Sequence, residues 1–274
     1  MEFNGLEKME RRSISWLVVA LWAGALAISA VHADVAMIGA GKDNTILQSN
    51  VNNSLGAGQA VFAGTSGQAS PRRGLIEFDV AGAIPAGATI NSVQLTLYLN
   101  SVAGGSASSP TIHLYRLFND WGEGSAGSSV NGASGVGQGF AAGEGDATWN
   151  ARHFSATTPT LWNTSGGDFA ATDSAALAIA GTTLNAPYTW GSTSGMVADV
   201  QSWLNDPSSN FGWLLRGDES SAATVRGFWT REAGRTGQSA FVPQLQVSYT
   251  PIPEPAGVML MLASFLSGIR RRGR

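Results

Sequence analysis

The stretch Thr89-Ile-Asn-Ser-Val-Gln-Leu-Thr-Leu-Tyr-Leu99 decides the fold of this chain. Val93, Leu95 and Leu97 fall on one side of an extended backbone, and polar residues fall between them. Alternation with a period of two is typical of a β-strand with one buried face. The same pattern returns in Gln244-Leu-Gln-Val-Ser-Tyr249 near the end of the chain. These two stretches predict an all-β fold.

Working outward, further runs of β-branched and aromatic residues are separated by turns rich in Gly, Ser, Asn and Pro. Many short strands with such turns are typical of a β-sandwich or barrel. The additional predicted strands are Asp43–Gln48, Gly74–Val80, Thr111–Phe118, Ala176–Ala180, Gly212–Arg216 and Val225–Thr230.

A single stretch, Ser194–Leu204, has helical periodicity. Met196, Val200 and Trp203 recur at i, i+4 and i+7, which places them on one face of an amphipathic helix. We expect Ser194 to cap its start and Asn205-Asp206-Pro207 to end it.

Residues 122–145 contain nine glycines and no periodicity. Loops longer than about 12–15 residues in a compact domain are usually functional or disordered. We interpret this segment as a mobile insertion, with a binding loop as the alternative.

Composition excludes several classes of protein. Charged residues make up only 13% of the chain, and residues 34–250 hold nine Lys/Arg against 15 Asp/Glu. A domain this acidic is no nucleic-acid binder. The absence of cysteine excludes disulfides, zinc-thiolate sites and thiol catalysis.

The N-terminal residues 1–33 have the three parts of a secretory signal peptide. Arg11-Arg12 precede the apolar run Trp16–Ile28, and Val31-His-Ala33 follows as a cleavage site for signal peptidase. An uncleaved anchor helix is the alternative.

The C-terminal residues 251–274 form a second signal. Pro253-Glu254-Pro255 precedes the apolar residues 256–269 and the basic tail Arg270–Arg274. The apolar run rises about 21 Å as a helix, short of the ~30 Å hydrocarbon core of a bilayer. The basic tail would stay cytoplasmic and leave residues 34–250 outside. The triplet, short transmembrane helix and basic tail resemble the PEP-CTERM sorting signal. This resemblance implies processing by an exosortase after transient inner-membrane anchoring; a plain tail anchor is the alternative.

Nine landmarks stand in order along residues 43–249: Asp43–Ile46, Arg73–Asp79, Ile84–Tyr98, Asp146–Asn150, Leu161–Asp168, Val197–Leu204, Asn210–Leu215, Phe228–Glu232 and Pro243–Tyr249. This order resembles the DNRLRE domain of disaggregatase-related proteins, which is similar to alginate-type carbohydrate-binding modules. The resemblance implies a jelly-roll β-sandwich that acts as a non-catalytic accessory or cell-surface domain. The glycine-rich segment before Asp146 departs from the compact pattern.

Tryptophan is the strongest chemical feature of residues 34–250. Aromatic rings stack on the C–H faces of sugars, although most tryptophans simply pack cores. We assign Trp149, Trp203 and Trp213 to the core. Trp121, Trp162 and Trp229 stand beside Gly, Asn or Arg and are the candidates for a carbohydrate-binding platform. Arg231 is the candidate partner of a uronate carboxylate.

Acidic loops provide candidates for a calcium site. Ca²⁺ takes six to eight oxygen ligands from carboxylates and carbonyls. Asp43, Asp146, Asp168 and Asp173 are the candidate ligands, although their spacing matches no EF-hand.

Catalytic patterns are weak. His113 and His153 are the histidines left after signal cleavage, and no Gly-x-Ser-x-Gly elbow surrounds any serine. The acids Glu123, Glu144, Asp146 and Asp168 lie near tryptophans as in a glycosidase cleft, but acids beside Gly and Asn are more often turn formers or cation ligands.

The sequence therefore favours an exported, non-enzymatic β-sandwich at the cell surface or in the extracellular matrix, associated with exopolysaccharide. One alternative is a structural biofilm-matrix or adhesion protein without a specific glycan site. A polysaccharide lyase or hydrolase is the less favoured alternative.

Overall fold

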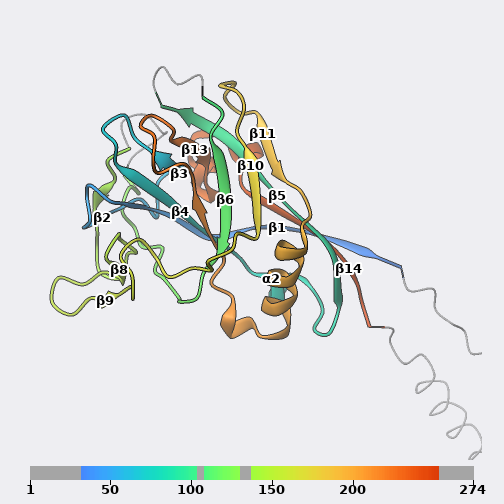
Figure 1. The fold of residues 1–274 in the computed structure, drawn as a ribbon. Coiled ribbons are helices and arrows are strands. Elements are labelled where there is room, and N and C mark those ends of the chain that lie inside the picture. The colour runs from blue at the N-terminus through green and yellow to red at the C-terminus, as the bar shows by residue number, and fades with distance from the viewer. Residues whose placement is uncertain (1–31, 104–107, 130–136, 253–274) are drawn as a thin grey trace, which may run out of the picture. The chain divides into compact units, whose positions relative to one another are not determined.

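The computed structural model describes residues 32–103, 108–129 and 137–252 (Figure 1). Almost all of the predicted signal peptide and sorting signal, Pro253-Glu254-Pro255 included, lies outside these residues. Within them, no helix has the length and apolar character needed to cross a bilayer.

Strands dominate the described chain, as the alternation predicted. The longer strands are β1 (Asp34–Leu47), β3 (Ala60–Thr65), β4 (Pro71–Phe78), β5 (Thr89–Val102), β6 (Thr111–Arg116), β10 (Ala175–Ala178), β11 (Pro187–Trp190), β12 (Trp213–Arg216), β13 (Arg226–Trp229) and β14 (Gln244–Thr250). Short strands pair as β2 (Asn53–Ser54) with β7 (Phe140–Ala141) and β8 (Ala151–His153) with β9 (Thr160–Leu161). The helices are α1 (Val80–Ala83), α2 (Ser194–Asn205) and three 3₁₀ turns at Pro207–Ser209, Arg231–Thr236 and Ser239–Phe241.

The longer strands pair antiparallel throughout and form one continuous ten-stranded sheet, which folds around the core as two layers. The first layer contains β14, β5, β13 and β11, and the second contains β4, β12, β6 and β10. Strand β1 joins them, because its first half pairs with β14 and its second half with β4, with an irregularity between Ala40 and Lys42. Strand β3 makes a second junction by pairing with both β13 and β4.

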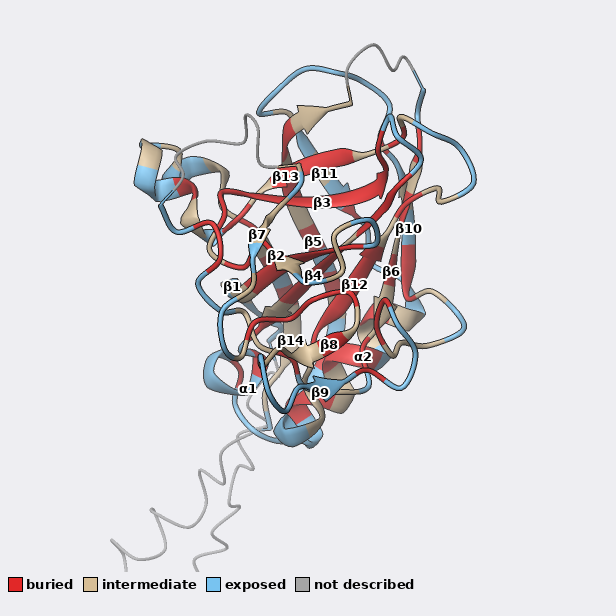
Figure 2. Cartoon of the chain, turned by 90° about the vertical axis from the view of Figure 1, so that its left-hand side faces the viewer, coloured by how far each residue is buried: buried red, intermediate tan, exposed pale blue. Residues whose placement is uncertain are grey.

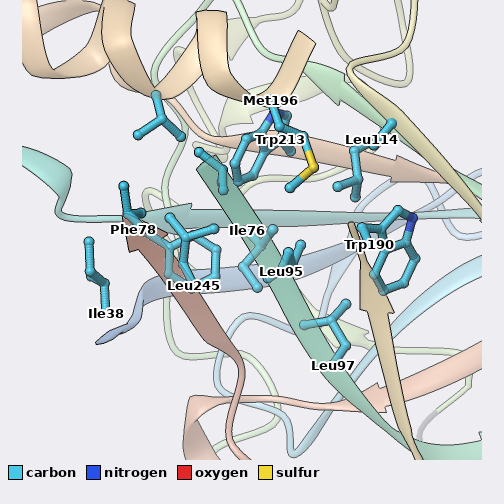
Figure 3. Close-up of a cluster of buried hydrophobic side chains, with 14 of the residues drawn as sticks. Ile38, Ile76, Phe78, Leu95, Leu97, Leu114, Trp190, Met196, Trp213 and Leu245 are labelled. Atoms are coloured by element: carbon cyan, nitrogen blue, oxygen red, sulfur yellow. The ribbon is translucent and has the colours of Figure 1, made fainter. Parts of the chain in front are cut away.

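The main core lies between the two layers (Figure 3). Leu95 and Leu97 of β5 belong to one cluster with Ile76 of β4 and Leu114 of β6. Val93, Leu95, Leu97 and Leu99 have no exposed surface, which confirms the face predicted from the alternation. Figure 2 shows the buried residues following the strands of both layers.

Helix α2 packs its predicted apolar face into this core. Met196, Val200 and Trp203 are all fully buried. Its cap differs from the prediction: the Thr193 hydroxyl, not that of Ser194, accepts the hydrogen bond from the Met196 N–H at 3.1 Å. The helix ends at Asn205, within the predicted stop signal.

A second cluster covers the outer face of the second layer. The chain between β6 and β10 places Trp121, Trp149 and Trp162 against Leu75 of β4 and Leu214 of β12. Trp149 is therefore a core residue, as predicted.

The flanks of the glycine-rich segment are packed rather than loose. A Cβ on Gly122 would stand 1.7 Å from the Gly145 carbonyl oxygen, and one on Gly124 would stand 1.4 Å from Asp146 Oδ1. These glycines therefore permit close approach of backbone and side chain. Residues 130–136 lie outside the described residues, so the predicted mobile insertion is not supported at its flanks and is untested at its centre.

Two strand predictions need correction. Strand β1 begins at Asp34, well before the predicted Asp43, and Val80 begins helix α1 instead of ending a strand. Among the longer strands, β3 and β11 were not predicted.

Candidate functional site

Two of the three predicted platform tryptophans lie inside the protein. Trp121 and Trp162 are only 1% and 5% exposed. Their indole N–H groups donate to the carbonyl oxygens of Phe211 and Thr148, both at 2.9 Å. Because neither ring presents a face to solvent, these two residues are core residues and the platform prediction is corrected for them.

Trp229 is different from every other tryptophan in residues 34–250, because it is the one that is not buried. It follows Phe228, which enters the main core, so Trp229 takes the outward side of β13. Its indole N–H donates to Asn185 Oδ1 at 2.8 Å, which fixes the ring against the turn before β11.

Polar and aromatic side chains of β5 and β11 lie on the same outward face of the first layer. Tyr98 contacts the ring of Phe241 with 5.5 Å between centroids. Thr96 and Thr189 form a cross-strand pair with 2.8 Å between hydroxyls. Trp229, Asn185, Tyr98, Phe241, Thr96 and Thr189 are named here the Trp229 face.

Arg231, the predicted partner of a uronate carboxylate, is already paired with carboxylates of the protein. Its guanidinium donates two hydrogen bonds to the Glu123 carboxylate, at 2.7 and 2.5 Å, and contacts Glu232 at 3.0 Å. The hydrogen bonds that Arg231 donates to the Glu123 carboxylate are the main cause that raises the pKa of Arg231 above its usual value. The geometry therefore does not leave Arg231 free for a uronate, although its side chain is 42% exposed.

Asp43, a predicted calcium ligand, is fully buried beside this pair. Its Oδ2 accepts the Arg231 N–H at 3.0 Å, whereas its Oδ1 has no hydrogen-bond partner. Burial, followed by the charge of Glu232, raises the pKa of Asp43 well above its usual value. Burial also raises the pKa of Glu232, whose Oε2 has no hydrogen-bond partner.

The other predicted calcium ligands are separate from one another. Asp146 accepts the N–H groups of Ser125 and Gly143 at 3.1 Å each, which makes it a turn former. Asp168 likewise accepts N–H groups of its own turn, from Asn163 and Thr164 at 2.9 Å.

Asp173, the fourth, binds His113 instead. Its Oδ2 lies 2.7 Å from His113 Nδ1. Across residues 32–103, 108–129 and 137–252 no three His, Cys, Asp or Glu residues gather to hold a metal ion. The four predicted ligands therefore do not form one calcium site.

His113 borders an open cleft of about 460 Å³ on the outer side of the second layer, which the sequence did not predict. Arg73 of β4, Arg216 of β12 and His113 of β6 are directly opposite one another in register, so their side chains form a row across three strands. The His113 cleft is lined by His113, Tyr115, Arg216, Gly217, Asp218, Glu219 and Ser220.

The side chains of the His113 cleft hold one another in place. The rings of His113 and Tyr115 stack with 6.0 Å between centroids and 25° between planes. Glu219 binds Arg73 at 2.6 Å and Arg216 at 2.9 Å. The alternation in 111–118 signals that His113 and Tyr115 share a face, but only the register of β6 on β12 brings Arg216 beside them.

Comparison of the chain with protein-family models gives no match, and comparison with curated proteins gives none either.

Proposed function

We propose that this chain is an exported, exosortase-sorted β-sandwich protein of the cell surface or extracellular matrix that binds exopolysaccharide without catalysing its breakdown. The proposal includes a jelly-roll arrangement of the two layers, as in the DNRLRE domain it resembles. One observation carries it: the half-buried Trp229 ring, locked in place by Asn185, on an outward face that also holds an aromatic pair and a hydroxyl pair.

Physical chemistry supports a sugar as the partner of the Trp229 face. The C–H face of a pyranose loses little on desolvation and stacks on an aromatic ring, whereas each hydroxyl needs a replacement hydrogen-bond partner. Asn185, Thr96 and Thr189 provide amide and hydroxyl groups on the same outward face. A rigid ring also loses little conformational entropy on binding.

The contacts of the serine and the histidine in the His113 cleft do not favour serine-hydrolase chemistry. The cleft serine, Ser220, donates its hydroxyl to Asp218 at 2.6 Å, and His113 pairs with Asp173. Neither contact is the nucleophile–base pair that a serine hydrolase requires.

The bounds of the described strands support export. Strand β1 begins at Asp34, directly after the predicted cleavage site, and strand β14 ends at Thr250, directly before the predicted sorting signal. The described strand pairings use no residue of either segment proposed for removal, so its loss would leave these pairings intact.

A glycan array with the full-length protein and Trp229→Ala tests the proposal. We expect saturable, sugar-specific binding, on the order of micromolar to millimolar, that Trp229→Ala weakens at least about tenfold. Phe118→Ala is the matched control, since Phe118 is an exposed aromatic residue (55%) outside the Trp229 face. The absence of any sugar-specific signal would overturn the proposal and favour a matrix or adhesion protein. Loss of binding in both variants would overturn the role of Trp229.

A further inference from the structure

The His113 cleft lies on the other layer from the Trp229 face. Its walls come from β6, β12 and the turn after β12, whereas the Trp229 face comes from β13, β5 and β11. The two surfaces share no residue, so a change in one leaves the contacts of the other intact.

The charges around the His113 cleft are balanced within the protein. Arg73 and Arg216 share the carboxylate of Glu219, and His113 has that of Asp173. Asp218, whose pKa is lowered to about 2 by hydrogen bonds from Ser220, adds a further negative charge at the rim.

Each cation at the cleft therefore already has a carboxylate partner, which removes the net positive charge that would attract an acidic sugar. Carboxylates equal or outnumber the positive charges that line the cleft, and the domain around it is acidic. A uronate carboxylate would meet like charge here. Arg231, two residues after Trp229 in the chain, is paired in the same way with Glu123.

The polar groups of the cleft instead match sugar hydroxyls, which both donate and accept. Carboxylates of Asp218 and Glu219 accept hydrogen bonds, and Arg216, whose side chain is 37% exposed, donates them. His113 uses Nδ1 for Asp173, which leaves Nε2 for a ligand. The stacked His113 and Tyr115 rings add a fixed apolar surface.

We propose that the His113 cleft is a second glycan-binding site and that its ligand is a neutral pyranose unit. The inference rests on the proposed function, because it names the class of glycan that the protein binds. It adds a site that acts independently of Trp229.

Affinity electrophoresis of the full-length protein in detergent tests the site. Gels contain neutral galactomannan, xyloglucan or dextran, or the uronate polymers alginate or polygalacturonate. We expect retention by at least one neutral polymer and by neither uronate, with little effect of added salt because no net charge pairing is involved. His113→Ala should weaken retention about fivefold, as expected for the loss of one ligand hydrogen bond.

His153→Ala is the matched control. The side chains of His153 and His113 are similarly exposed, at 33% and 36%. Each also lies beside an aspartate, Asp120 at 3.4 Å for His153 and Asp173 at 2.7 Å for His113. We expect unchanged retention. Thermal unfolding of both variants confirms that each is folded. In the Trp229→Ala background, His113→Ala should reduce the remaining retention by the same factor, because distant sites are additive.

The outcomes separate the two proposals. Normal retention of His113→Ala together with weaker retention of Trp229→Ala overturns the assignment of the His113 cleft as a glycan-binding site. The proposed function is unaffected by that result. Retention only by alginate or polygalacturonate overturns the neutral-glycan inference alone. Retention by none of the five polymers, with no signal on the glycan array, overturns both.

Discussion

At the scale of single residues, the buried carboxyl of Asp43 makes the stability of the folded state depend on pH. Its pKa is raised well above 3.8 by burial and by Glu232, whose own pKa is also raised by burial. A neutral carboxyl is tolerated in this position at low pH. Stability therefore falls as the pH rises from the ordinary carboxyl pKa of the unfolded chain toward the raised pKa of the folded state, because the unfolded chain releases this proton first.

Asp43→Asn should remove most of this penalty. The Asn oxygen still accepts the Arg231 N–H, but no charge is buried. Urea unfolding should give a variant that gains stability relative to wild type as the pH rises above about 4. A variant that is less stable by the same amount at every pH would contradict this account.

Trp203 makes a second residue-scale prediction. It is fully buried, and its ring meets Trp213 at 4.6 Å between centroids in an edge arrangement. Trp203→Ala should lower the free energy of unfolding by about 3–5 kcal/mol, because it removes a large buried surface and leaves a cavity. A loss below about 1 kcal/mol would show that this part of the core is not formed as described.

At the scale of elements, α2 depends on its cap. Thr193 Oγ1 accepts the Met196 N–H, and its hydroxyl also donates to the Ser174 carbonyl oxygen. Thr193→Ala should cost about 0.5–2 kcal/mol in thermal or chemical unfolding. Thr193→Ser keeps the hydroxyl and should cost much less; equal losses in the two variants would mean that the cap does not act through this oxygen.

Elements with strong periodicity could be predicted from the sequence, and the others could not. The strand β5 and the helix α2 each bury one face, so their patterns are visible. Strand β3 is buried along its whole length, which removes the alternation. Pro187 opens β11, and a proline argues against a strand except at an edge or a first position.

The site was less predictable than the fold for a related reason. The residue types beside Trp121 and Trp162 resemble those beside Trp229, and only packing in three dimensions separates buried from exposed rings. The row of Arg73, Arg216 and His113 depends on strand register, which one sequence does not specify.

At the scale of the whole molecule, export predicts a defined mature chain. Intact-mass analysis of the protein from its extracellular fraction should give a chain that begins at Asp34 and lacks Arg270–Arg274. The sheet itself spans Asp34–Thr250, so processing at both ends should leave its unfolding transition unchanged. An unprocessed chain in the cytoplasm would contradict the export proposal.

The most direct test of polysaccharide binding is iodide quenching of Trp229 fluorescence in the mature protein. The other six tryptophans of residues 34–250 are buried, so the difference between wild type and Trp229→Phe isolates this ring. Saturating amounts of the polysaccharide selected on the glycan array should protect Trp229 from iodide, because a stacked sugar covers the exposed part of the indole. Unchanged quenching at saturation would show that the sugar does not contact Trp229 and would contradict the central claim.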